Sequence, residues 1–393
     1  MEIKPAADLR RLRVDQVGSL AAPPRLREAY QRRQGGEADE DSLRRVQDEV
    51  IRDYVRKQEA IGMPLVTDGE FRRGNFQESF GAAVSGFDVP ADGADLSRAN
   101  VNRAPYQRAE QDFNAPGPPI VTRRPVVERL RLVRNVPLEE YRFSSSVATR
   151  PVKVTLLSPD RISQRFAYEQ SRQVYKDMDE FLADVVAIER EMITGLIRAG
   201  CQYIQIDAPG YTAYVDPPSL ERMRARREDP DANLERSIRA DNAVIEGFQD
   251  VTFGIHVCRG NPRTIDPSTG RIVPQWHRVG AYDGIAERLF TGLKHHRLLL
   301  EYDSERAGGF GPLRFVPRDK VVVLGLVTTK SEDVESLADL THRIGEASRH
   351  LPLEQLALSP QCGFGGVGGV VLPEAAQWRK FERILETART VWG

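Results

Sequence analysis

A histidine and a cysteine lie two residues apart in the segment Phe253-Gly254-Ile255-His256-Val257-Cys258, just before a Gly-Asn-Pro loop. The apolar residues around them are typical of a β-strand that ends at this loop. Side chains at positions i and i+2 of a strand point to the same face. The imidazole and the thiol would therefore face one point, as ligands of a tetrahedral zinc ion do. Two ligands do not complete such a site, so other segments must supply the rest.

Two further candidate ligands follow later apolar segments. Glu301 lies at the end of the segment 297–302, and Cys362 follows the segment 356–361 and precedes a glycine-rich run. A carboxylate is the hardest donor among these four groups, so Glu301 is the ligand that a substrate would displace at a catalytic zinc. A single strand-end histidine or cysteine is more often structural. The ordered set of four residues is what predicts a metal centre.

Other polar residues also stand at the ends of apolar segments. Glu70 and Asp207 are acids that could hold a substrate ammonium group, whereas Arg72 and Arg73 could bind an anionic group or pair with acids. Lys330 follows the most apolar segment, 320–327. The complete set of candidate substrate-binding or catalytic residues is Ser19, Asp68, Glu70, Arg72, Arg73, Asn75, Asp207 and Lys330.

About eight apolar segments alternate with helical patterns along the chain, which predicts an α/β fold. Apolar segments without a clear alternation indicate a parallel sheet that is covered on both sides. Eight such units predict one (β/α)8 TIM barrel over residues 1–393, with its active site at the carboxyl ends of the strands. All the candidate residues lie at such ends, so we expect them to converge. Two segments interrupt the pattern, an insertion at about 87–150 that resembles a hairpin or lid and a hairpin at about 262–278.

Composition limits the classes of function. Of the 393 residues, 40% are hydrophobic and 29% are charged, with a net charge of −1, so nothing indicates binding to nucleic acid. We expect no membrane span and no signal peptide, and hence a cytoplasmic protein with reduced thiols. The three cysteines argue against a disulfide framework. We expect Cys201 to pack in the core and His295 to be solvated, and a homo-oligomer is left open.

Several motifs, taken in order, resemble the catalytic barrel of cobalamin-independent methionine synthase, and more closely the short single-barrel members of that family. The resemblance covers essentially the whole chain. The motifs are Val17-Gly18-Ser19-Leu20, Thr67-Asp68-Gly69-Glu70-Phe71-Arg72-Arg73, Ile204-Gln205-Ile206-Asp207-Ala208-Pro209, His256-Val257-Cys258, Glu301 and Ser359-Pro360-Gln361-Cys362-Gly363.

The resemblance implies a zinc ion held by His256, Cys258, Glu301 and Cys362, with the substrate thiol bound as thiolate. It also implies that homocysteine contacts Ser19 through its carboxylate, and Glu70 and Asp207 through its amino group. A zinc-bound thiolate stays reactive at neutral pH, whereas a free thiol has a pKa of about 8.5. The expected partners are therefore a small thiol and an alkyl donor.

Three positions depart from the family pattern. The proton-donating histidine of the family falls near Lys330, its folate-facing aromatic residue falls on Leu157, and Ala208 stands where the synthases usually carry glutamate. The leading hypothesis is a zinc-dependent S-methyl or S-alkyl transferase whose donor is open. One alternative is an enzyme that opens an epoxide with a sulfonate thiol such as coenzyme M, using Lys330, Arg72 and Arg73. Another is a zinc- and thiol-binding protein without catalysis, and a decarboxylase on a related barrel is a further one.

Overall fold

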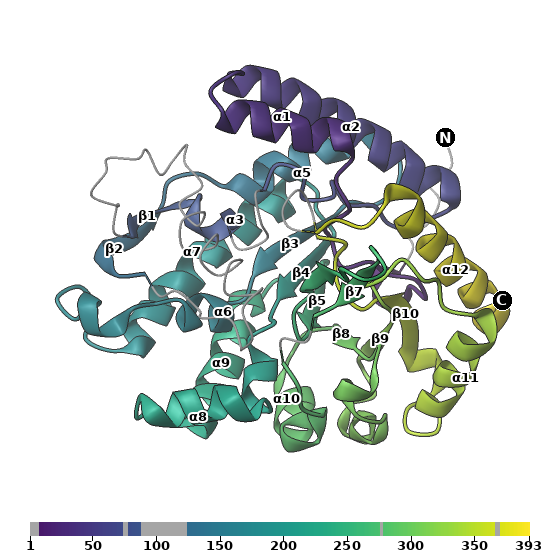
Figure 1. Cartoon of the computed structure of the whole chain (residues 1–393). Helices are drawn as coiled ribbons and strands as arrows, with labels where there is room; N and C mark the ends of the chain where they lie inside the picture. The colour runs from purple at the N-terminus through teal and green to yellow at the C-terminus, as the bar shows by residue number, and fades with distance from the viewer. Residues whose placement is uncertain (1–7, 74–77, 88–123, 276–277, 366–369) are drawn as a thin grey trace.

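A ring of parallel strands forms the centre of the computed structural model, which describes residues 8–73, 78–87, 124–275, 278–365 and 370–393 (Figure 1). Six strands pair in parallel in the order β10-β9-β8-β5-β4-β3. Their bounds are β3 Lys153–Leu157, β4 Tyr203–Asp207, β5 Thr252–Val257, β8 Arg297–Glu301, β9 Val321–Val327 and β10 Leu356–Pro360.

Two extended segments close the ring between β10 and β3. In the first, Val14 pairs in parallel with Leu358 of β10; in the second, Val66 pairs with Val152, immediately before β3. A parallel bridge from Ser19 to Gly69 joins the two segments. The predicted (β/α)8 barrel is confirmed. The first of its strands was expected over 14–20 and is present as isolated bridges.

Helices surround the ring and cover the outward faces of the strands (Figure 1). Helix α2 occupies the polar segment 40–61, and after the loop that follows β9 the chain becomes helical again only at Leu337. The delay has a physical cause, because Glu335 accepts a hydrogen bond from the Thr328 amide at 2.7 Å and pairs with Lys380 at 3.3 Å, which holds 328–335 as a loop. No helix in the described part of the chain is long and apolar enough to cross a membrane. The α-helices are α1 Pro24–Gln34, α2 Glu40–Ile61, α3 Glu78–Gly81, α5 Val136–Val147, α6 Pro159–Gln164, α7 Met178–Arg198, α8 Pro217–Ala225, α9 Pro230–Ile245, α10 Ala286–Gly292, α11 Leu337–Ala347 and α12 Glu374–Trp392.

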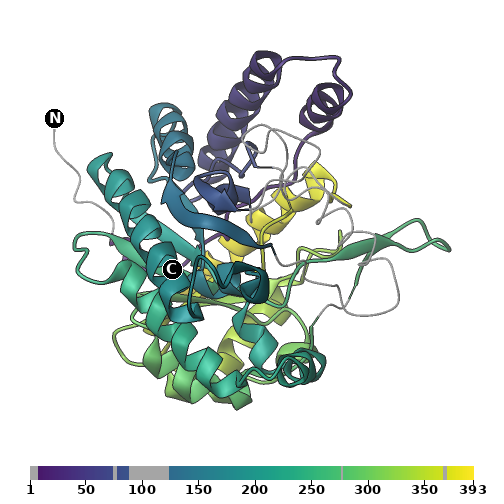
Figure 2. The same cartoon turned by 90° about the vertical axis from the view of Figure 1, so that its left-hand side faces the viewer.

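Two antiparallel strand pairs lie outside the barrel wall. Strand β2 (Val126–Leu132) lies within the first expected insertion and pairs with β1 (Val84–Phe87), which ends where that insertion was expected to begin. Strands β6 (Arg263–Ile265) and β7 (Ile272–Pro274) pair within the second. The second pair projects from the body of the molecule (Figure 2). Helix α5 lies inside the range 87–150 but packs against α2, α7 and β3 as a barrel helix. We therefore propose narrower limits for the first insertion, about 84–132.

The inside of the barrel has a polar half and an apolar half. In the polar half, the carboxylate of Asp15 accepts hydrogen bonds from Lys153 at 2.8 Å, Arg297 at 3.0 Å and the Tyr203 hydroxyl at 2.6 Å. These four residues are buried, and each charge has an opposite partner, as a low-dielectric interior requires. The apolar half consists of Leu299, Val321, Val323 and Ala357. The expectation that the strands do not alternate is therefore wrong for the polar half, where polar side chains point inward.

A cluster of buried acids lies behind the carboxyl end of β3. Ser158 donates a hydrogen bond to Asp241 at 2.8 Å, and the Tyr211 hydroxyl donates to its other oxygen at 2.5 Å. Asp160 accepts hydrogen bonds from Ser237 at 2.7 Å and from Tyr214 at 3.0 Å. Burial, with the nearby Asp160 charge as a second cause, raises the pKa of Asp241 to about 7. Its ionised form is thus disfavoured in the folded protein.

The raised pKa of Asp241 predicts that the free energy of unfolding falls as pH rises. The pKa of Asp241 goes from 3.8 in its ordinary state to about 7 in the fold, so the folded state binds the extra proton between those values. Stability from this group is complete below about pH 4 and is lost as pH rises through 7, by roughly 2–4 kcal/mol. Asp241→Asn should remove that loss, measured as the urea midpoint at pH 5 and pH 8. The exposed Asp231→Asn on the same helix is the control, and an unchanged slope in Asp241→Asn would contradict the assignment.

Candidate functional site

Three of the four predicted metal ligands come together at the carboxyl ends of β5 and β10. The ligand atoms of His256, Cys258 and Cys362 all lie within 4.8 Å of one another. The two sulfurs are 3.9 Å apart, far beyond the roughly 2.05 Å of a disulfide, and both cysteines are free. His256 and Cys258 are buried, and Cys362 is partly exposed. The i, i+2 spacing in β5 does bring the imidazole and one thiol to the same point.

Contacts among the two sulfurs and the imidazole shift the pKa of each of the three groups. A hydrogen bond from Cys362 is the largest of the causes that lower the pKa of Cys258 well below its ordinary value, and the same contact raises the pKa of Cys362. Burial alone would lower the pKa of His256, but the Cys258 thiolate raises it above its ordinary value. The pair of sulfurs thus holds one negative charge next to an imidazole.

The cluster fits a zinc ion. Among the described residues, both ring nitrogens of His256 are buried without a hydrogen-bond partner, which is costly unless something else binds them. Zinc–sulfur bonds of about 2.3 Å in a tetrahedron place two sulfurs about 3.8 Å apart, close to the separation found here. One imidazole and two thiolates are a donor set that zinc prefers. The residues present therefore suit the metal that the sequence predicted.

Glu301 lies beside this cluster but is bound to other groups. Its carboxylate accepts a hydrogen bond from the Arg259 amide at 2.6 Å, pairs with Arg306, and lies 3.5 Å from the Lys330 ammonium. Lys330 itself pairs more closely with Asp303, at 2.7 Å. Burial raises the pKa of Glu301, and the charges of Asp303 and Cys258 act in the same direction. Glu301 is not among the three residues grouped within 4.8 Å in the described chain, and its role as fourth ligand stays a prediction.

Asp207 lies next to the metal cluster and close to Glu70. It pairs across the sheet with His256, and its carboxylate accepts a hydrogen bond from Gln205 at 2.6 Å. Burial raises the pKa of Asp207 to about 7; the His256 charge opposes the rise and the Glu70 charge adds to it. A cation close to both buried acids, such as an ammonium group, would favour their ionised forms.

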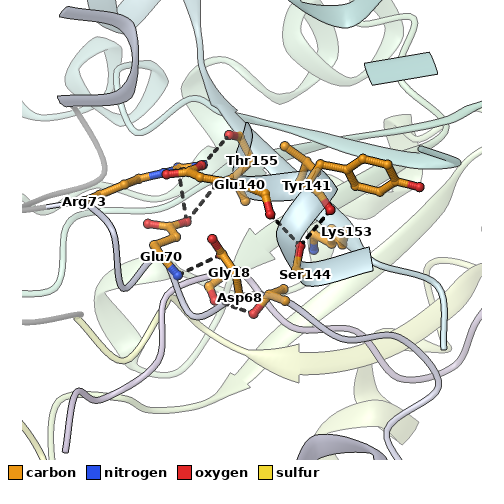
Figure 3. A pocket seen from close by; sticks show the side chains of 11 residues that line it. Gly18, Asp68, Glu70, Arg73, Glu140, Tyr141, Ser144, Lys153 and Thr155 are labelled. Atoms are coloured by element: carbon orange, nitrogen blue, oxygen red, sulfur yellow. Dashed lines mark hydrogen bonds and ion pairs between the residues drawn. The ribbon is translucent and has the colours of Figure 1, made fainter. Parts of the chain in front are cut away.

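Glu70 sits in an unusual backbone conformation. Its φ is +57°, and the preceding Gly69 has φ +72°, so two consecutive residues are left-handed. The Thr155 hydroxyl donates a hydrogen bond to the Glu70 carboxylate at 2.7 Å, and the Asp68 carboxylate accepts one from the Glu70 amide at 2.9 Å (Figure 3). The turn thereby fixes the Glu70 carboxylate over the end of β3.

The two arginines of this motif go to different places. Arg73 points inward and makes a buried ion pair with Glu140 at 2.6 Å, with Glu70 3.6 Å away (Figure 3). Arg72 points to the outer helices, where it pairs with Asp48 and lies over the Phe143 ring at 4.4 Å. Of the two interpretations of these arginines, pairing with acids is the one that the contacts support.

A small pocket lies between the Glu70 turn and β3 (Figure 3). Its volume is about 10 Å³, the least that holds one water molecule. Asp68 lines it with one carboxylate oxygen that has no hydrogen-bond partner, and burial raises the pKa of this acid. Asp68 therefore supports the turn and faces the pocket.

Ser19 lies against the loop that carries Cys362. Its hydroxyl accepts a hydrogen bond from the Gly365 amide at 3.3 Å, and its carbonyl accepts one from the Phe364 amide at 2.8 Å. A β-carbon at Gly363 would lie 2.0 Å from the Ser19 hydroxyl, so Ser19 touches the loop that carries Cys362. Asn75, the remaining predicted substrate contact, lies outside the described residues.

The family model "Cobalamin-independent synthase, Catalytic domain" matches residues 13–265. The chain belongs to this family. Its curated relatives include two proteins of Bacillus subtilis described as uncharacterized, YxjH at 32% identity and YxjG at 34% identity, with 97% of this chain and 94% of each relative covered. A methionine synthase of Sulfolobus acidocaldarius is 22% identical, over 88% of this chain and 84% of its own length.

Solved structures of the family confirm the fold. A protein of Listeria monocytogenes described as a vitamin-B12-independent methionine synthase superposes with a TM-score of 0.69 at 24% identity, over 97% of this chain and 98% of its own. The B12-independent methionine synthase of a Shewanella species, solved with selenomethionine, gives a TM-score of 0.67 at 17% identity, over 97% of both chains. At identities this low, the comparison with solved structures establishes the barrel fold but not the reaction.

Several residues of the site were missed from the sequence. Glu140, Thr155 and Asp303 each contact a predicted residue, at Arg73, Glu70 and Lys330 respectively. For Thr155 a signal existed, since Lys153 and Thr155 are polar at i and i+2 of a strand and so share one face. For Glu140 no such signal existed, because an acid in a polar helix is usually solvated. His295, expected to be solvated, is fully buried without a partner for its ring nitrogens, whereas Cys201 is buried as expected.

Proposed function

We propose that this protein transfers a methyl or other alkyl group to the sulfur of a thiol amino acid such as homocysteine. The observation that carries the proposal is the cluster of His256, Cys258 and Cys362 at the mouth of a barrel of this family. Zinc would be held by these three residues with Glu301 as the fourth and displaceable ligand, and when bound it stabilises the thiolate form of the substrate. The reaction forms a sulfur–carbon bond and breaks the bond between that carbon and the donor.

The residues around the cluster would bind and orient the acceptor. Glu70 and Asp207 would hold its ammonium group, because two close carboxylates are stabilised by a cation. Ser19 would contact its carboxylate. Lys330 is held by Asp303 and lies 3.5 Å from Glu301, so we propose that it positions Glu301. Holding the acceptor in this orientation speeds the reaction, because the loss of translational and rotational entropy occurs on binding and not in the chemical step.

The contacts of the basic residues speak against a sulfonate thiol as the acceptor. The epoxide-opening hypothesis assigned the anionic tail to Lys330, Arg72 and Arg73. Each of these residues is paired with a carboxylate, at Asp303, Asp48 and Glu140 respectively.

The alternative of a binding protein without catalysis is tested by looking for a product. Mass spectrometry should detect S-methylated homocysteine when the zinc-loaded protein is supplied with methyl donors, including methyltetrahydrofolate. Absence of alkylated thiol with every donor would favour the non-catalytic alternative.

The role of the acid pair predicts a selectivity for amino thiols. Wild-type protein should bind homocysteine more tightly than 4-mercaptobutyrate, which lacks the amino group. Asp207→Asn should reduce this preference roughly tenfold, because it removes one charge-assisted contact. Affinities are measured from the rise in the thermal unfolding midpoint with thiol concentration. The exposed Asp179→Asn is the control, and an unchanged preference in a zinc-loaded Asp207→Asn protein would refute the assigned role.

A further inference from the structure

Two guanidinium groups beside the candidate metal centre have no carboxylate within 4.0 Å among the described residues. Arg161 lies on α6, immediately after β3, and is partly buried. Its one hydrogen bond goes to the side-chain oxygen of Gln164 at 3.3 Å, and its buried Nε has no partner. Arg278, which is buried, donates to the Pro209 carbonyl and to the Thr212 hydroxyl. Both arginines thus satisfy hydrogen bonds with neutral groups and leave their charges unpaired.

Contacts through the end of β4 bring the two arginines together. A β-carbon at Gly210 would lie 1.7 Å from Oδ2 of Asp160 and 2.6 Å from Nε2 of Gln164, the residue that Arg161 contacts. The adjacent Pro209 carries the carbonyl that Arg278 binds. From the same loop, the Thr212 hydroxyl donates to the Cys258 carbonyl at 2.8 Å. The pair is therefore linked to the metal-binding end of β5 by one short loop.

The acids nearest to these two arginines already have other partners. Burial, followed by the charges of Arg278 and Arg165, lowers the pKa of Arg161 to about 9. Burial also lowers the pKa of Arg278, while Asp216, Asp160 and the Cys258 thiolate act in the opposite direction. Asp160 accepts hydrogen bonds from Ser237 and Tyr214, and burial raises its own pKa. Asp216 caps helix α8.

We propose that Arg161 and Arg278 bind an anionic oxygen group, such as a carboxylate or phosphate, on the alkyl donor. This inference rests on the proposed alkyl transfer and names the class of its second substrate. The acceptor's charged groups are assigned to Glu70, Asp207 and Ser19, so the arginine pair remains for the donor. The donor's anionic group does not react: the thiolate sulfur forms the new bond to carbon, and the leaving group departs with the electron pair.

The anion site can be tested without any reaction. Inorganic phosphate, titrated at constant ionic strength, should raise the thermal unfolding midpoint of the wild-type protein in a saturable way. Arg161→Gln should lose the saturable part, since this side chain makes a single weak hydrogen bond and its loss leaves the fold intact. Arg172→Gln, which removes an exposed arginine paired with Glu169, is the control and should behave like wild type. A saturable response that persists in Arg161→Gln would overturn the site.

Assignment to the donor is tested with two alkylating reagents that differ only in charge. Iodoacetate and iodoacetamide both alkylate homocysteine, and mass spectrometry measures the protein-dependent rate of each. The ratio of the iodoacetate rate to the iodoacetamide rate should fall roughly tenfold in Arg161→Gln and recover in Arg161→Lys. If homocysteine binding weakens instead, with the ratio unchanged, the pair binds the acceptor and the proposal is wrong. If wild type alkylates no thiol with either reagent, the alkyl transfer fails, and the phosphate titration still decides the anion site.

Discussion

Cys362→Ser will lower the zinc affinity by at least roughly 100-fold and abolish thiol alkylation, because it removes one of three converging ligands. Cys362 lies 104 residues from Cys258 in the chain, yet the two sulfurs are 3.9 Å apart. Serine offers a harder and far less acidic donor, so the remaining imidazole and thiolate cannot complete a tetrahedral site. Zinc content is measured by mass spectrometry of the purified protein, and affinity by competition with a chromophoric chelator.

Cys201→Ser is the matched control for this experiment. Cys201 is also buried and free, but its sulfur contacts the Tyr203 carbonyl at 3.5 Å and lies outside the cluster. This variant should retain stoichiometric zinc even if it loses some stability. If Cys362→Ser and Cys201→Ser carry equal zinc, the metal centre and the function built on it are both wrong.

The second large effect concerns the buried ion pair that supports the Glu70 turn. Arg73 and Glu140 are 4% and 5% exposed, so Glu140→Gln leaves a guanidinium charge without a full partner in a low-dielectric interior. We expect a loss of about 3–5 kcal/mol in the free energy of unfolding, the cost of breaking a buried pair from one side. The urea unfolding curve of the purified variant measures it.

The neighbouring residue supplies the control for that loss. Glu139 pairs with Arg134 in the same helix region, but these side chains are 40% and 48% exposed. Glu139→Gln should cost about 0–1 kcal/mol, because solvent screens the pair. Equal losses for the two substitutions would mean that the Arg73–Glu140 pair is not buried as described.

The fold could be predicted from the sequence because its signal is repeated along the chain. Apolar segments that alternate with helical patterns indicate a parallel barrel, and the barrel then places every strand end at one mouth. The His-x-Cys motif could be placed for a local reason, since i and i+2 share a face in β5. The meeting of Cys362 with Cys258 needed the closed ring, which depends on bridges such as Val14 to Leu358.

The partners of charged side chains could not be predicted in the same way. Arg72 and Arg73 are neighbours in sequence, yet one points to Asp48 on an outer helix and the other to Glu140 in the interior. Which way each points depends on the turn at Gly69 and Glu70. The dipeptide Asp68-Gly69 is a turn signal, but it does not fix the left-handed conformation of Glu70. Glu301 shows the same limit, because its pairing with Arg306 and its closeness to Lys330 arise from loops that follow different strands. Pairing of this kind is set by three-dimensional packing and not by periodicity.

Glu70 has a consequence for protein engineering. A residue other than glycine, asparagine or aspartate at positive φ costs on the order of 1 kcal/mol, so Glu70→Gly would relieve backbone strain while it deletes the carboxylate. The same replacement would leave the buried Thr155 hydroxyl and the Arg73 guanidinium without the Glu70 carboxylate, so the relief of strain and the loss of contacts would oppose each other. Libraries intended to alter acceptor choice should keep positions 69 and 70 constant and screen for turnover from the first round.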